Sequence, residues 1–135
     1  MAQFKNITNR ELQKAFDFYL DLLELDGNII AIQLEATNCR KDKLMPAWGW
    51  CTQDSITEYT IEIDRTLSRK NVLTVLAHEL THVKQYVTGA LVDPVGRQRV
   101  PRWMGKPCGL PYHLQPWEID ARINELVLYN AWSKK

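Results

Sequence analysis

Two histidines and a glutamate stand at a spacing that suits a metal ion. The chain of 135 residues contains three histidines, and two of them, His78 and His82, are four residues apart with Glu79 directly after the first. On an α-helix, residues at this spacing lie one turn apart on nearly the same side, so both imidazoles can reach one ion. Glu79 lies beside them, where its carboxylate can take a proton from a metal-bound water. The spacing therefore predicts a hydrolytic zinc (Zn2+) site.

The alternative interpretation is a pair of solvated histidines on an exposed surface. It requires that the surrounding residues do not form a packed helix, but apolar residues recur with helical period from Ser68 to Gly89. Ser68 can cap the start of this helix and Gly89 can end it. We therefore predict a helix that holds both histidines to one side of a buried stripe. The stripe consists of Val72, Leu76, Leu80, Val83 and Val87.

A third protein ligand is expected, because a catalytic zinc normally takes three and leaves one position for water. The candidates after Gly89 are Cys108, His113, Glu118 and Asp120. We favour Glu118, since a carboxylate in an otherwise apolar segment needs a partner. His113 is the main alternative, in which case Glu118 would only offset the positive end of its helix dipole.

Further residues near this site have predicted roles in catalysis. Tyr112 is a candidate donor of a hydrogen bond to the oxyanion formed in hydrolysis, and so is His113 if it is not a ligand. Asp120 is a candidate for orienting a ligand histidine by accepting from its far nitrogen. The predicted catalytic residues are Glu79, Tyr112 and His113, and the predicted metal ligands are His78, His82 and Glu118.

The segments before the metal helix predict a helix followed by a small sheet. Thr8 to Glu11 has the form of a capping box and starts a helix from about residue 9 to residue 25. Alternating apolar residues then predict three strands joined as an antiparallel meander. Their ranges are 30–35, 48–52 and 56–63, with a hairpin at 53–55. In the last strand, we expect Tyr59, Ile61 and Ile63 to face the core.

The segments after the metal helix predict a long loop and a closing helix. Residues 89–115 lack a period and are rich in glycine and proline, which predicts a loop. Helical spacing returns from Pro116 to Trp132. The fold class is therefore α+β, in the order helix, three strands, metal helix, long loop, helix. The loop also carries four basic residues around Trp103, and we favour a solvated loop over a patch for a nucleic acid or another acidic partner. These residues are Arg97, Arg99, Arg102 and Lys106.

Composition bounds the kind of protein. A hydrophobic content of 45% over this length predicts one domain, 1–135, with one core. A net charge of +1 gives no overall sign of a nucleic-acid or membrane partner. The first residues contain no apolar segment preceded by basic residues, and no apolar run approaches membrane-spanning length, so we expect no export by a classical signal. Three cysteines, Cys39, Cys51 and Cys108, fit reduced thiols better than a disulfide framework, so we expect a soluble, cytoplasmic protein.

Two motifs together resemble a known family. His78-Glu79-Leu80-Thr81-His82, followed further along by Pro116-Trp117-Glu118-Ile119-Asp120-Ala121, resembles the minimal gluzincin-type zinc metallopeptidases. This group includes small phage-encoded peptidases and the ImmA/IrrE-like proteins, and the resemblance covers residues 56–131. It implies a zincin-like fold in which His78, His82 and Glu118 bind zinc and Glu79 is the general base. Larger gluzincins place an aspartate one helical turn after the ligand glutamate to orient a histidine, whereas this chain has Arg122 there.

The predicted function is a zinc-dependent endopeptidase that acts on a protein or peptide. Glu79 would take a proton from the attacking water and deliver it to the leaving amine. SprT-like proteases, which have a histidine as third ligand and act on DNA-bound proteins, are the nearest alternative family and would favour His113 and the basic loop. The alternative from a different class is a non-catalytic zinc module, such as a phage structural or regulatory factor.

Overall fold

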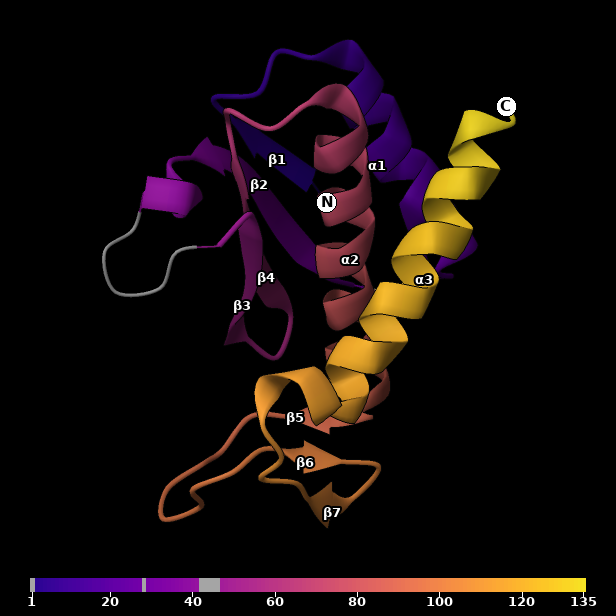
Figure 1. Cartoon of the computed structure of the whole chain (residues 1–135). Helices are drawn as coiled ribbons and strands as arrows, with labels where there is room; N and C mark the ends of the chain where they lie inside the picture. Colours follow the sequence, from indigo (N-terminus) through magenta and orange to yellow (C-terminus); the bar gives the residue numbers. More distant parts are fainter. Residues whose placement is uncertain (1, 28, 42–46) are drawn as a thin grey trace.

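The computed structural model describes residues 2–27, 29–41 and 47–135, which form three α-helices and two β-sheets (Figure 1). This confirms the α+β class. The helices are α1 (Arg10–Leu22), α2 (Arg69–Thr88) and α3 (Pro116–Ser133). The larger sheet contains β1 (Ala2–Lys5), β2 (Ala31–Thr37), β3 (Gly49–Ser55) and β4 (Glu58–Asp64). The smaller sheet contains β5 (Leu91–Val92), β6 (Arg102–Trp103) and β7 (Lys106–Pro107), and two short 3₁₀ helices are η1 (Cys39–Lys41) and η2 (Tyr112–Leu114).

The core lies between α1, α2 and one face of the larger sheet (Figure 1). The β4 side chains Tyr59, Ile61 and Ile63 are buried in it, as the alternation predicts. The end of α3 contributes Leu128 to the same cluster. Burial of this apolar face holds α2 against the sheet.

The caps of α2 agree with the sequence. The Ser68 hydroxyl accepts a hydrogen bond from the Asn71 amide at 3.3 Å, and Gly89 ends the helix in the left-handed region at φ 79°. The first helix ends at Leu22, earlier than predicted, because the chain turns at Glu24, whose φ is 58°. The third helix begins at Pro116, as predicted.

The predicted antiparallel meander is confirmed for β3 and β4, which form an antiparallel hairpin, but it is wrong for β2. The strand order is β1-β2-β4-β3, and β2 pairs with β4 in parallel, so the sheet is mixed. The connection from β2 to β3 is long enough to pass the position of β4, and the turn at residues 56–57 then brings the chain back between β2 and β3. Alternation identifies strands but carries no information about which strands are neighbours. The sequence analysis also missed β1, which pairs with β2 in parallel.

The predicted long loop is also wrong, because residues 89–115 contain the antiparallel β5-β6-β7 sheet and η2. Strands of two residues are too short to show a period. The turn between β6 and β7 has positive φ at Met104 and Gly105, which is the geometry of a tight hairpin. The Trp103 and Trp117 rings lie 6.3 Å apart between centroids, so the small sheet contacts the start of α3.

Within the described part of the chain, no helix is long and apolar enough to cross a membrane.

Candidate metal centre

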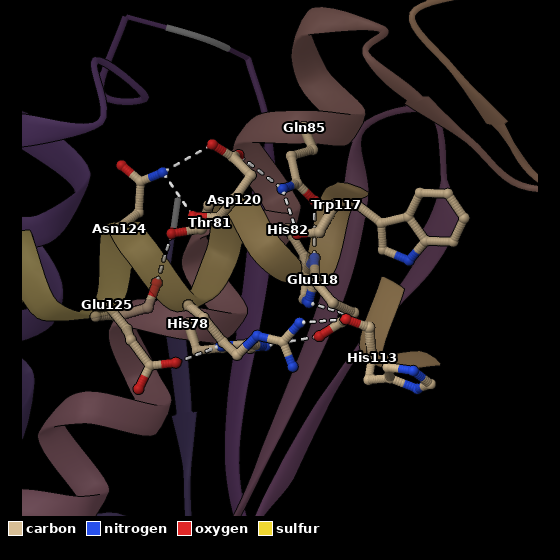
Figure 2. Close-up of polar contacts among 12 residues, drawn as sticks. His78, Thr81, His82, Gln85, His113, Trp117, Glu118, Asp120, Asn124 and Glu125 are labelled. Carbon is tan, nitrogen blue, oxygen red and sulfur yellow. Dashed lines mark hydrogen bonds and ion pairs between the residues drawn. The ribbon is translucent and has the colours of Figure 1, made fainter. Parts of the chain in front are cut away.

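The site lies where α2 packs against the first turns of α3 (Figure 2). The rings of His78 and His82 are 5.0 Å apart between centroids. A nitrogen of each ring and a carboxylate oxygen of Glu79 all lie within 4.8 Å of one another. His78, Glu79 and His82 therefore form a group that could hold a metal ion.

Glu118 of α3 contacts both histidines. Its Oε1 lies 3.0 Å from Nε2 of His78, and its Oε2 lies 3.1 Å from Nε2 of His82 (Figure 2). The small Ala121, one turn further along α3, is fully buried and allows the two helices to approach closely. The two Nε2 atoms thus converge on a single buried carboxylate.

The far nitrogen of His82 is held by Gln85, which lies three residues further along α2. Gln85 Nε2 donates to the backbone carbonyl of Trp117 and to Oδ2 of Asp120, each at 2.9 Å. This orients the amide so that Gln85 Oε1 accepts from Nδ1 of His82 at 2.8 Å. When His82 is neutral, this acceptor keeps the proton on Nδ1, so the Nε2 lone pair can bind a metal ion.

The far nitrogen of His78 is held by Glu125, whose Oε1 lies 2.7 Å from Nδ1 (Figure 2). Glu125 lies two helical turns after Glu118, so both carboxylates face α2. The sequence analysis missed this residue because it considered only Asp120 and the position of Arg122 for an orienting carboxylate. The signal that would have found Glu125 is its seven-residue spacing from Glu118.

Asp120 does not contact a histidine directly. Its carboxylate accepts from Gln85 and, at 3.0 Å, from Nδ2 of Asn124 (Figure 2). Asp120 is therefore linked to His82 only through Gln85, a residue that the sequence analysis also missed. The spacing of three residues between His82 and Gln85 on one helix is the signal for that contact.

The charges in this cluster shift one another's protonation. Burial lowers the pKa of His78, but hydrogen bonds to Glu118 and Glu125 outweigh it and raise the pKa to about 10. Burial raises the pKa of Glu118, but hydrogen bonds from both histidines outweigh it and hold the pKa well below its usual range. The positive charge of His78 and the negative charge of Glu118 therefore stabilise each other.

Glu79 occupies a different environment. It is 5% exposed, and burial raises its pKa, while the neighbouring histidines oppose the shift. A Cβ at Gly49 would meet Val75 Cγ1 and the backbone oxygen of Glu62, both at 2.7 Å, so glycine is needed for β3 to lie this close to α2. A Cβ there would also lie 3.7 Å from Glu79 Cγ, which places the β3 backbone beside Glu79.

A cavity of about 710 Å³ opens onto the histidine pair. The start of β3 forms one wall, and β3 is an edge strand of the larger sheet. Five aromatic residues line the cavity, together with small and apolar residues, Arg122 and the polar groups of the site. These aromatic residues are Trp48, Trp50, Tyr86, Tyr112 and Trp117.

Of the two predicted oxyanion donors, the structure places only Tyr112 in the cavity. Desolvation and the negative charge of Glu118 raise the pKa of Tyr112 to about 12. His113 is exposed on η2 and is not among the residues that line the cavity; its backbone carbonyl accepts from Arg122 Nη2 at 3.1 Å. Cys108 is a free thiol and also lies outside the lining.

No protein-family model matches the chain, and no curated protein or solved structure matches it either. The interpretation of the site therefore depends on its own geometry and chemistry. Two imidazole nitrogens converge on one carboxylate, and each imidazole is held by an acceptor at its far nitrogen. Imidazole nitrogens and carboxylate oxygens of this kind can together hold a metal ion.

Proposed function

We propose that the protein is a zinc-dependent metallopeptidase of the gluzincin type. The observation that carries the proposal is the contact of both carboxylate oxygens of Glu118 with the Nε2 atoms of His78 and His82. This is the ligand set that the sequence motifs imply, and it unites residues from two separate helices. The exposed position of His113 supports Glu118 over the SprT-like alternative.

In this proposal, His78, His82 and Glu118 hold the ion. When bound, zinc supplies Lewis acidity, which polarises a substrate carbonyl and makes a water molecule more acidic. Glu79 takes the proton from the attacking water and delivers it to the leaving amine. Tyr112, in the cavity wall, donates a hydrogen bond to the developing oxyanion. Glu125 and Gln85 keep the two imidazoles in place.

The proposed substrate is a protein or peptide in extended conformation. The β3 strand has one paired side, to β4, within the described residues, and its first residues line the cavity. An extended peptide can add to such an edge through backbone hydrogen bonds. The aromatic lining offers apolar contacts for its side chains.

The decisive experiment compares the parent protein with Glu79→Gln, both loaded with zinc. The substitution removes the base and no ligand, so zinc content should stay at about one ion per chain. Hydrolysis of a peptide library, followed by mass spectrometry, should fall by roughly 10² to 10⁴-fold.

The matched control is His113→Gln, which should retain both zinc and activity. A zinc-loaded parent that cleaves no peptide would contradict the proposal and support a non-catalytic zinc module. Loss of zinc from the His113 variant, with zinc kept by Glu118→Ala, would favour the SprT-like alternative.

A further inference from the structure

The outer side of α3 carries a continuous row of exposed apolar side chains. Its members are 41% to 60% exposed and follow one another at spacings of four, three and one residues. On a helix these positions lie along one side, which we call the outer stripe. The outer stripe consists of Ile119, Ile123, Leu126 and Val127.

The opposite side of the same helix is already used for packing. Trp117, Ala121 and Leu128 are buried against the rest of the molecule. In Figure 1, α3 (orange to yellow) lies at the margin of the molecule, and none of the other described elements is drawn along its outer side. A helix that is apolar on both sides is normally covered on both sides. The outer stripe is therefore an uncovered packing surface.

The size of the outer stripe suits a modest protein interface. Taking the exposed fractions together, the four side chains present roughly 400 Å² of surface, in the range where apolar patches are often functional. Homodimer interfaces are about 65% apolar, so such a stripe corresponds to roughly 600 Å² buried per copy. Two copies together would bury about 1,200 Å², the lower limit of stable specific interfaces.

The charged residues beside the outer stripe already have partners within the chain. The Asp120 carboxylate accepts from Gln85 and Asn124, and Arg122 donates to the backbone carbonyl of His113. The stripe itself contains no charged residue, so two copies meet without repulsion between like charges.

We propose that the outer stripe of α3 is the interface of a homodimer, with a second copy of this chain as its occupant. The interface is isologous, because each copy contributes the same surface. Interfaces at this lower end of the size range are typical of weak association, so we expect a dissociation constant on the order of 1 to 100 μM. Association through the outer stripe requires neither the metal nor peptidase activity.

Sedimentation equilibrium of the full chain from about 1 to 300 μM tests the proposal, since this range spans the expected constant. The parent protein should pass from monomer to dimer. Ile123→Glu and Leu126→Lys place charges in the stripe and should each weaken association at least tenfold, with the circular dichroism spectrum unchanged. The control is Ile56→Lys, at a residue 87% exposed in the turn between β3 and β4, which should dimerise like the parent.

Two results would overturn the proposal. One is a parent protein that remains monomeric at the highest concentration, which would leave the stripe to a different partner. The other is a dimer that both stripe variants retain, which would place the interface elsewhere.

Discussion

The two sides of α2 are built in different ways. Toward the sheet, Leu73, Leu76 and Leu80 are at most 2% exposed and belong to the apolar core. Toward α3, His78 and His82 are bound by side chains that come from two helices. The first side needs apolar volume at the right period, and several residues of similar size would fill it. The second side needs a specific partner for each polar atom.

This difference separates stability from chemistry within one helix. The apolar side holds α2 in place by burial alone, so the helix does not need an ion in order to pack. The polar side contributes charges that are costly if they are left unpaired. Substitutions on the two sides should therefore have distinct signatures.

The largest expected effect is on zinc binding and comes from the polar side. His82→Ala removes a ligand and should weaken zinc binding by roughly 10³-fold or more, about 4 kcal/mol, because a few ligands share the whole binding free energy. Glu118→Ala should do the same. The fold should persist, since the apolar side is intact. Competition with a chelator measures the affinity, and zinc binding equal to that of the parent in both variants would contradict the ligand assignment.

Leu80→Ala tests the apolar side and should show the reverse pattern. The side chain is fully buried, so its truncation leaves a cavity and should lower the free energy of unfolding by about 2 to 5 kcal/mol. Denaturant titration measures this loss. The folded fraction should bind zinc as tightly as the parent does. A large loss of zinc affinity in the folded state would show that the two sides are not independent.

Glu125→Gln tests whether the contact to the far nitrogen of His78 matters. The amide keeps the size of the side chain but removes the negative charge that faces Nδ1, so zinc affinity should fall by about 10 to 100-fold. Chelator competition on the apo protein gives the value without an activity assay. Glu58→Gln, the same substitution at an exposed residue of β4 outside the cavity lining, is the matched comparison. An unchanged zinc affinity in the Glu125 variant would show that the contact between Glu125 and His78 does not contribute to zinc binding.

The smallest expected effect is at the start of α2 and involves neither side. Ser68→Ala removes the acceptor for the Asn71 amide and should cost about 1 kcal/mol of stability. Ser68→Asp keeps an acceptor and should restore most of it. The midpoint of thermal unfolding is measured for the parent and both Ser68 variants. Equal midpoints would show that the cap contributes nothing to stability.

Contacts close in sequence made some features predictable. The bounds of α2 and the shared side of His78 and His82 depend on residues within four positions of one another, so the sequence determined them. The same holds for the inward alternation of β4 and for the start of α3 at Pro116. In each case the backbone period alone decides which way the side chains point.

Only the tertiary structure decided the features that join distant segments. The parallel pairing of β2 with β4 depends on the path of the chain between them, which no local period encodes. The strands of the small sheet contain two residues each, and these residues form strands only because they pair with one another. Glu125 reaches His78 only because α3 packs along α2. The sequence therefore determined the direction of each side chain on its own element, whereas packing between elements decided which partner it meets.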